Sequence, residues 1–171
     1  MELLETARLY LRPTMRSDSK NLYHVHRDTA VSRLLCDVDR MTRHHSGCLL
    51  HRYVGHWKTF GCGFYLVFDK GEPATPPLGR CGLRMTPEQE VELGYCFTRA
   101  ATGRGLATEA AAAVVDYTFQ RMAIDQIVAF VRPENHASMR VLAKLGFYEV
   151  GPVEQGRSYL RFVLQRSAHR P

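Results

Sequence analysis

One segment, 99–110 (RAATGRGLATEA), combines residue types that suit the binding of an anion. The apolar run 91–97 precedes it and an alanine-rich segment ending near Met122 follows it, which predicts a strand, a glycine turn and a helix that starts at Gly103. The first turn of a helix offers unpaired backbone N–H groups and the positive end of the helix dipole. Gly103 and Gly105 leave those amides uncovered. The segment is a candidate pyrophosphate site, although two glycines also fit a plain strand-to-helix turn.

The segment differs from the two best-known phosphate loops. A P-loop has Lys followed by Ser or Thr after its last glycine, whereas Leu106 and Ala107 follow Gly105 here. The dinucleotide fingerprint has three glycines, and this segment has two. Arg99 and Arg104 add positive charge beside the turn, which favours an anionic ligand of another kind.

The segment resembles the acyl-CoA pyrophosphate loop of the GNAT acyltransferases, Gln/Arg-x-x-Gly-x-Gly/Ala. It is closer still to W-G-x-G-Y-A-T-E-A of the RimJ/RimL-type branch, from which it differs at Thr102, and Ala100 stands where the superfamily has Gln or Arg. The residues that match the branch are Gly103, Gly105, Ala107, Thr108, Glu109 and Ala110. The resemblance implies that acetyl-CoA is bound by Arg99, Gly103, Arg104, Gly105, Leu106, Ala107 and Thr108.

A second stretch, 132–147 (RPENHASMRVLAKLGF), predicts a helix from Asn135 or His136 to Leu145. Asn135 alone fits an N-cap and Gly146 fits the residue after the helix. The whole string also resembles the GNAT motif Asn-x-x-Ser/Ala…Leu-Gly-Phe, at the family spacing from the glycine loop. The resemblance implies that Asn135 contacts the pantetheine arm of CoA and that Ser138 lies near its sulfur.

The strand 91–97 (VELGYCF) carries the candidate base, Glu92. A carboxylate can take the proton of an ammonium acceptor, although a strand Glu is as often a solvated surface residue. By resemblance, the backbone of Tyr95, Cys96 and Phe97 pairs with pantetheine, and Gly94 permits a bulge that splays this strand from 126–131.

The general acid is less evident in the sequence. Many superfamily members carry a Tyr seven positions beyond the Asn, where this chain has Leu142, which cannot donate a proton. Ser138 is the substitute that we predict, with Tyr148 as the second choice.

Composition fits one soluble domain spanning 1–171. Hydrophobic content is 45% and charged content is 23%, and no apolar stretch approaches the ~20 residues of a membrane helix. The segment 1–5 lacks the basic and apolar regions of a signal peptide. Five scattered cysteines without a Cys-x-x-Cys pair indicate reduced thiols in a cytoplasmic protein.

The net charge of +6 raises the alternative of nucleic-acid binding, but the arginines are spread and no nucleic-acid-binding motif accompanies them. Attraction of an anionic ligand explains the charge as well. His44, Cys48 and His51 could share a helical face and hold zinc, yet a fourth ligand is not evident, so no metal is predicted.

Periodicity and turn residues predict the remaining elements. Helices are expected at 19–27, 29–35 and 41–60. The resemblance to the superfamily implies that this region builds the acceptor pocket. Strands are expected at 6–13, 64–68, 79–85, 90–97, 126–131, 147–150 and 158–164, followed by a flexible tail at 165–171.

These observations predict a single α/β domain of the GNAT fold, with a central mixed, V-splayed β-sheet and helices on both faces. The resemblance implies acetyl transfer from acetyl-CoA to a primary amine, either a protein N-terminus or a small molecule. The alternative is a CoA-binding regulatory module without turnover, which Leu142 favours and which Glu92 and Ser138 disfavour. A homodimer stays open.

Overall fold

The computed structural model describes residues 2–31, 41–72, 75–154 and 157–169. Its strands form one eight-stranded sheet in the order β1-β2-β3-β4-β5-β6-β8-β7. Neighbouring strands are antiparallel except for β5 and β6, which are parallel. The strands are β1 (Leu4–Glu5), β2 (Leu9–Pro13), β3 (Phe64–Asp69), β4 (Gly79–Met85), β5 (Val91–Phe97), β6 (Gln126–Val131), β7 (Tyr148–Glu154) and β8 (Ser158–Gln165).

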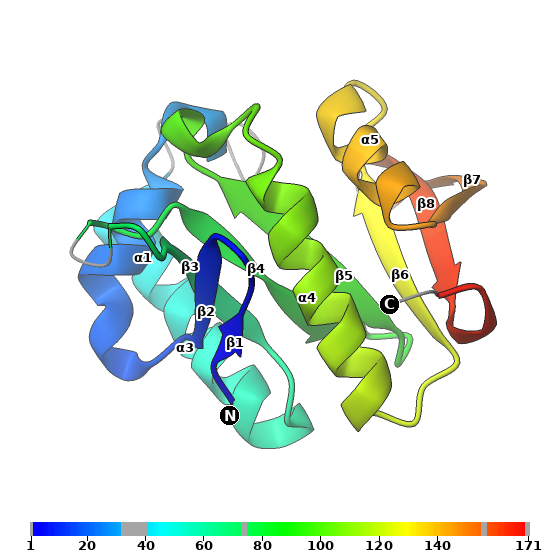
Figure 1. Ribbon diagram of the computed structural model, residues 1–171, viewed down its shortest axis with the longest axis horizontal. Coiled ribbons are helices and arrows are strands. Elements are labelled where there is room, and N and C mark those ends of the chain that lie inside the picture. The colour runs from blue at the N-terminus through cyan, green and yellow to red at the C-terminus, as the bar shows by residue number, and fades with distance from the viewer. Residues whose placement is uncertain (1, 32–40, 73–74, 155–156, 170–171) are drawn as a thin grey trace.

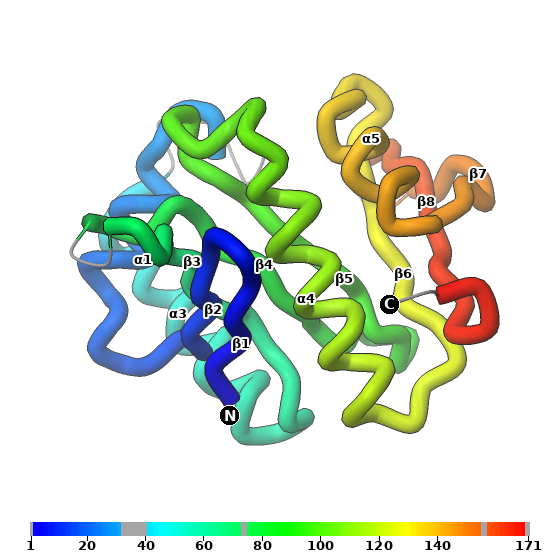
Figure 2. Tube along the Cα trace, in the orientation of Figure 1, coloured from blue at the N-terminus to red at the C-terminus, as the bar shows by residue number. Residues whose placement is uncertain are grey.

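Helices cover both faces of this sheet, as predicted (Figure 1). The helices are α1 (Ser19–His26), α3 (Arg43–Phe60), α4 (Leu106–Arg121) and α5 (His136–Lys144), with short 3-10 turns at Arg16–Asp18, Arg99–Ala101 and Arg166–Ala168. Successive side chains of strand β3 point to opposite faces of the sheet. Tyr65 and Val67 pack in the cluster that contains α4, whereas Phe64 and Leu66 pack with α1 and α3. The tube in Figure 2 shows α4 lying across the front of the central strands.

Glycines and polar caps set the ends of the helices. Helix α3 begins after Thr42, whose hydroxyl accepts from the His45 N–H, and ends at Gly61, which has a φ of 68°. Helix α4 begins at Leu106, not at Gly103 as predicted. Gly103 and Gly105 both have a φ of 76°, a left-handed conformation that a right-handed helix excludes, so the loop extends to Gly105.

The central strands lie where they were predicted, but the predicted strand 6–13 is replaced by β1 and β2 with a turn between them, and β7 extends to Glu154. The predicted bulge at Gly94 of β5 is not seen in its pairing with β4, which runs without a break in register from Val91 to Phe97. Gly94 instead makes room for packing, because a Cβ there would lie 3.2 Å from the ring of Phe64. The predicted helix at 29–35 falls partly outside the described residues.

The C-terminal segment is tied to the domain through the last described residues. Gln165 ends β8, and the Arg166 guanidinium donates to the carbonyls of Phe119, Met122 and Ile124. His169 lies 2.8 Å from a carboxylate oxygen of Asp116. Residues 165–169 therefore contact the domain, although we expected them in a tail.

Among the described residues, the helices are too short or too polar to cross a membrane.

Candidate active site

The sheet opens between β5 and β6. These strands pair only at Glu92 and Val128. Beyond that pair they diverge toward their carboxyl ends, where the glycine loop and the start of α5 lie on opposite sides of the opening (Figure 1). The V-splayed sheet predicted from the sequence is thus present.

The direction of backbone groups along β5 follows from its pairing with β4. The Thr98 N–H donates to the Leu78 carbonyl at 2.8 Å, so it points toward β4. Backbone groups alternate in direction along an antiparallel strand, which turns those of Cys96 toward β4 and those of Tyr95 and Phe97 toward the opening. Tyr95 and Phe97 can therefore pair with an extended ligand. The backbone of Cys96 cannot do so, contrary to the prediction, because it faces β4, and its thiol packs with Val25 and Val31.

The glycine loop offers an open backbone at the amino end of α4. Among the described atoms, a Cβ on Gly103 would meet nothing within 4 Å, and a Cβ on Gly105 would meet only Arg8 Nη2, at 3.6 Å. The amides of Leu106, Ala107 and Thr108 follow in the first turn of the helix. The Leu106 side chain is buried in the core, so it can contribute only its backbone.

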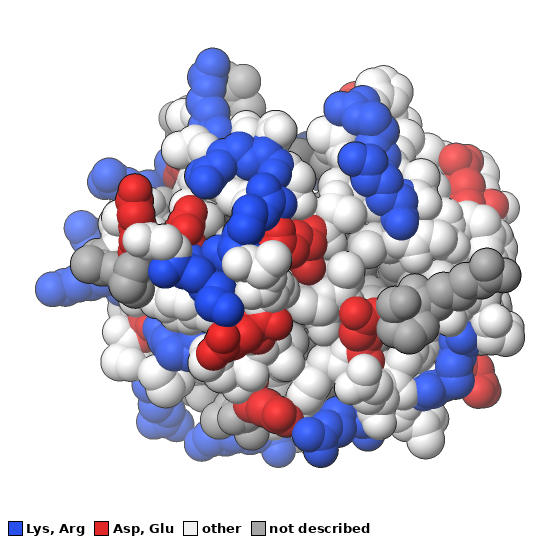
Figure 3. Space-filling model, in the orientation of Figure 1, with Lys and Arg blue, Asp and Glu red and all other residues white. Residues whose placement is uncertain are grey.

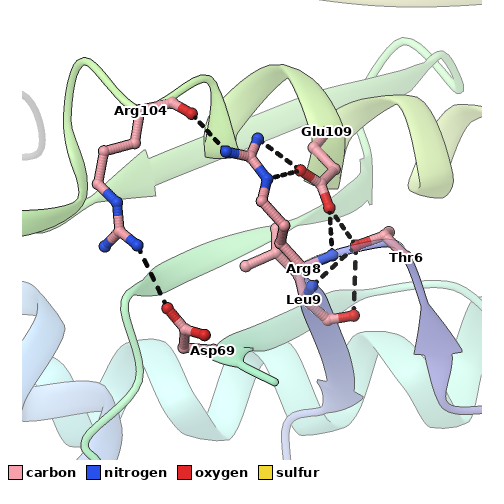
Figure 4. Close-up of polar contacts among 6 residues, drawn as sticks. All are labelled: Thr6, Arg8, Leu9, Asp69, Arg104 and Glu109. Carbon is pink, nitrogen blue, oxygen red and sulfur yellow. Dashed lines mark hydrogen bonds and ion pairs between the residues drawn. The ribbon is translucent and has the colours of Figure 1, made fainter. Parts of the chain in front are cut away.

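A network of hydrogen bonds holds this loop in place (Figure 4). The Glu109 carboxylate accepts from the Thr6 hydroxyl at 2.6 Å, the Arg8 backbone N–H at 2.8 Å and Arg8 Nε at 2.6 Å. Arg8 Nη1 in turn donates to the Arg104 carbonyl at 2.9 Å. Partial burial raises the pKa of Glu109, but the hydrogen bonds from Thr6 and Arg8 outweigh it and leave the pKa below its usual value. We name Thr6, Arg8 and Glu109 the loop clamp.

The two arginines beside the loop remain exposed. Arg104 Nη2 lies 3.4 Å from an Asp69 carboxylate oxygen, and the Arg99 backbone N–H donates to Asp28 Oδ2 at 3.1 Å. Figure 3 shows Lys and Arg side chains over the glycine loop and over α5, on both sides of the opening. This charge suits a polyanionic ligand.

The start of α5 forms the other wall. Asn135 Oδ1 accepts from the Ser138 N–H at 3.1 Å, so Asn135 caps the helix and keeps its amide group as a donor. Ser138 Oγ lies 2.8 Å from the Tyr95 hydroxyl, which also donates to the Ser138 carbonyl at 3.2 Å. Burial raises the pKa of Tyr95, and the bond to Ser138 opposes this only in part. Tyr148 is 50% exposed on β7 and does not line the cavity described below, and Leu142 is fully buried.

Glu92 lies on the face of β5 that is turned toward α3. Its carboxylate accepts from Arg84 Nε at 2.7 Å and from Arg84 Nη2 at 2.9 Å, across the β4–β5 pair. The Glu92 side chain is only 9% exposed. Burial raises its pKa by more than the hydrogen bonds and charge of Arg84 lower it, so the carboxylate is more basic than a solvated Glu.

One cavity of about 1240 Å³ joins these groups. It extends from α3 to the start of α5 and is lined by five residues that the sequence predicted, Glu92, Tyr95, Cys96, Asn135 and Ser138, whereas the glycine loop does not line it. Its lining also includes residues of α3 and β4 that the sequence did not single out, among them Arg52, Tyr53, His56, Arg80 and Arg84. His44, Cys48 and His51, which the sequence analysis considered as zinc ligands, do not form a group of three. Cys48 Sγ lies 3.7 Å from His44 Nε2, but among the described residues no three His, Cys, Asp or Glu side chains could hold a metal ion together.

Comparisons with known proteins agree with this architecture. Residues 8–148 match the acetyltransferase (GNAT) domain family, and the chain belongs to that family of N-acetyltransferases. It is 31% identical over 156 residues to the uncharacterized protein YkkB of Bacillus subtilis (strain 168), covering 85% of this chain and 84% of YkkB. It is 44% identical over 63 residues to the probable N-acetyltransferase YjcK of the same organism, covering 37% and 35% of the two chains.

Solved structures share the fold at low identity. A GnaT-family acetyltransferase from Bordetella pertussis has a TM-score of 0.83 and 22% identity, covering 95% of this chain and 99% of that one. RimL, a ribosomal L7/L12 α-N-protein acetyltransferase solved with coenzyme A, has a TM-score of 0.82 and 16% identity, covering 98% and 99%. The neighbours thus include the branch to which the sequence motifs are most similar.

Proposed function

We propose that this protein transfers an acetyl group from acetyl-CoA to a primary amine by direct attack within a ternary complex. Acetyl-CoA supplies the activated acetyl group. The amides at 106–108 and the arginines Arg99 and Arg104 would hold its pyrophosphate, while the open backbone of Tyr95 and Phe97 would hold pantetheine. The fit is supported by the uncovered glycine loop and by the split between β5 and β6.

Glu92 accepts the proton of the acceptor ammonium in this proposal, directly or through water. Each carboxylate oxygen bonds to one nitrogen of Arg84 and retains a lone pair for the substrate. The raised pKa brings the carboxylate closer to the working pH, where a general base is most effective. The presence of this buried carboxylate in one cavity with Ser138 is the observation that carries the proposal.

The Tyr95–Ser138 pair supplies the proton for the departing thiolate. Ser138 Oγ would give its proton to the departing thiolate and regain one from solvent, while the Tyr95 hydroxyl 2.8 Å away holds the Ser138 hydroxyl in position. Tyr95 belongs to β5, and its hydroxyl, paired with Ser138, takes the place of the tyrosine hydroxyl that is missing from the helix at Leu142. A thiolate also leaves without a strong acid, so this step contributes less than the base.

The acceptor is a protein N-terminus or a small amine. RimL, whose fold is shared, acts on a protein N-terminus, while the depth of the cavity suits a small molecule as well. A cytoplasmic location belongs to the same proposal. Leu142 favours the alternative of a CoA-binding module without turnover, whereas the family and the buried Glu92 support an enzyme.

The test is a screen of acetyl-CoA consumption against amines and N-terminal peptides, with the acetylated product identified by mass spectrometry. We expect turnover with at least one amine class and retention of the acetyl group on nitrogen. Firm binding of acetyl-CoA without acetylation of any amine would favour the regulatory module.

A further inference from the structure

Arg80 is a buried cation at the acceptor end of the cavity. It lies on β4, is 5% exposed, and lines the same cavity as Glu92. Its guanidinium carbon lies 4.4 Å from the centre of the Phe64 ring and 5.2 Å from that of Tyr53. Stacking on two rings fixes the plane of the guanidinium but leaves its charge without an opposite charge.

The described acidic side chains form no ion pair with this charge. Among the described residues no carboxylate lies within ion-pair distance of Arg80, and its Nε is buried without a hydrogen-bond partner. The nearby carboxylate of Glu92 accepts from Arg84 instead. A guanidinium buried in this way is costly unless an anion joins it, so the site has a built place for an anionic group.

Counted together with Arg80, the charged side chains at this end of the cavity carry a net positive charge. Three guanidinium groups, of Arg52, Arg80 and Arg84, line the cavity there with two carboxylates, of Glu88 and Glu92. Because Arg84 pairs with Glu92 and Arg52 is exposed, Arg80 is the buried cation left for a ligand.

We infer that the acceptor is an amine that also carries a carboxylate, with Arg80 binding the carboxylate while Glu92 receives the ammonium. This inference rests on the proposed acetyl transfer. Arg80 and Arg84 are four residues apart on one face of β4, about 13 Å between Cα atoms, and Glu92 is paired with Arg84. The spacing favours amino carboxylates in which several bonds separate nitrogen from the carboxylate over the shortest ones.

The experiment compares two series of acceptors with the wild-type protein. One series consists of ω-amino carboxylates from glycine to 6-aminohexanoate, and the other of alkylamines of matched length. A third arm uses peptides whose second residue is Glu or Gln, which distinguishes a free amino acid from an acidic peptide as the source of the carboxylate. We expect kcat/KM to be about 30-fold or more higher for an amino carboxylate, or for the Glu peptide, than for its uncharged counterpart.

The variant Arg80→Met removes the charge and keeps much of the volume. It should abolish this preference through KM, leaving alkylamine turnover and acetyl-CoA affinity within about threefold of wild type. Arg121→Met, at an exposed arginine of α4, is the matched control and should keep the preference. If Arg80→Met does not fold, inhibition of the wild type by hexanoate, competitive with the amine, supplies the same test.

Two results are decisive against the inference. Equal or better turnover of alkylamines by the wild type, with no inhibition by hexanoate, would overturn the carboxylate site and leave acetyl transfer intact. Acetyl-CoA binding without turnover in any arm would overturn the proposed function and this inference with it.

Discussion

The two faces of β5 are built by different means. On the α4 side, the proposed ligand surface consists largely of backbone groups, from the short loop 103–108 and from Tyr95 and Phe97 at one strand edge. On the α3 side it consists of side chains from separate elements, such as Tyr53, Arg80 and Arg84. The contrast indicates that a ligand shared by a whole family is recognised by conformation, while the acceptor is selected by side chains that can differ without altering the fold.

The largest expected effect of a single change is on the α4 side. Gly105→Glu places a carboxylate among the amides proposed to bind pyrophosphate, and it also strains a residue with a φ of 76°. We expect acetyl-CoA affinity to fall by at least ~10²-fold in calorimetric titrations, since several hydrogen bonds to phosphate are lost. Gly105→Ala is the control, because it introduces the strain without the charge and should lose much less affinity. Unchanged affinity in folded Gly105→Glu would refute the loop as the phosphate site.

A smaller effect is expected at the proton donor. Ser138→Ala and Tyr95→Phe should each lower kcat by about 10-fold, because each breaks the hydroxyl pair, and the double variant should be little worse than either. Acetyl-CoA affinity should stay constant, since the backbone of Tyr95 is retained. Tyr148→Phe, outside the cavity, is the control and should behave as wild type. Additive losses in the double variant would show that the two hydroxyls act separately.

The loop clamp should have a modest effect on the same side. Glu109→Gln keeps one acceptor oxygen but turns the other into a donor that faces Arg8, so acetyl-CoA affinity should fall several-fold and the free energy of unfolding by about 1 kcal/mol. The pKa of Glu109 is lowered in the folded state, so its contribution is present above the unfolded pKa and is lost as pH falls through the folded pKa. Denaturant unfolding at neutral and acidic pH checks this, with exposed Glu149→Gln as control. A variant with wild-type affinity and stability would remove any role for the clamp.

The smallest effect concerns salt. If the positive charge of the loop and of α5 attracts phosphates, raising ionic strength from about 0.1 M to about 1 M should weaken acetyl-CoA binding only a few-fold, because screening shortens from ~10 Å to ~3 Å. Steep salt dependence of RNA binding, without acetyl-CoA binding, would instead support a nucleic-acid function.

The sequence predicted the fold and the local conformation on the α4 side well, because the signals for both are local. Glycines at 103 and 105, an Asn cap at 135 and alternating apolar residues each determine the conformation of their own segment. The predicted start of α4 at Gly103 was wrong, because Gly103 and Gly105 adopt a left-handed conformation and so belong to the loop before the helix.

The arrangement of side chains on the α3 side depends on contacts between segments that are distant in the sequence, and hydrophobic periodicity does not predict such contacts. Arg84 meets Glu92 only because of the register of β4 and β5, and Arg80 reaches Phe64 and Tyr53 only when three elements pack together. Tyr95 likewise reaches Ser138 from another element, so the proton donor could not be assigned from the helix alone.

The most direct test of acetyl transfer with Glu92 as the base is a pH–rate profile of wild type and Glu92→Gln on one amine found by the screen. Gln keeps the shape but cannot take a proton, so kcat/KM should fall by ~10²–10⁴ near neutral pH while acetyl-CoA affinity is unchanged. The wild-type rate should rise as pH passes the raised pKa of Glu92, and the variant should lack that rise and recover in part at high pH, where the amine is already deprotonated. Coincident profiles for the two proteins would contradict the assignment of Glu92.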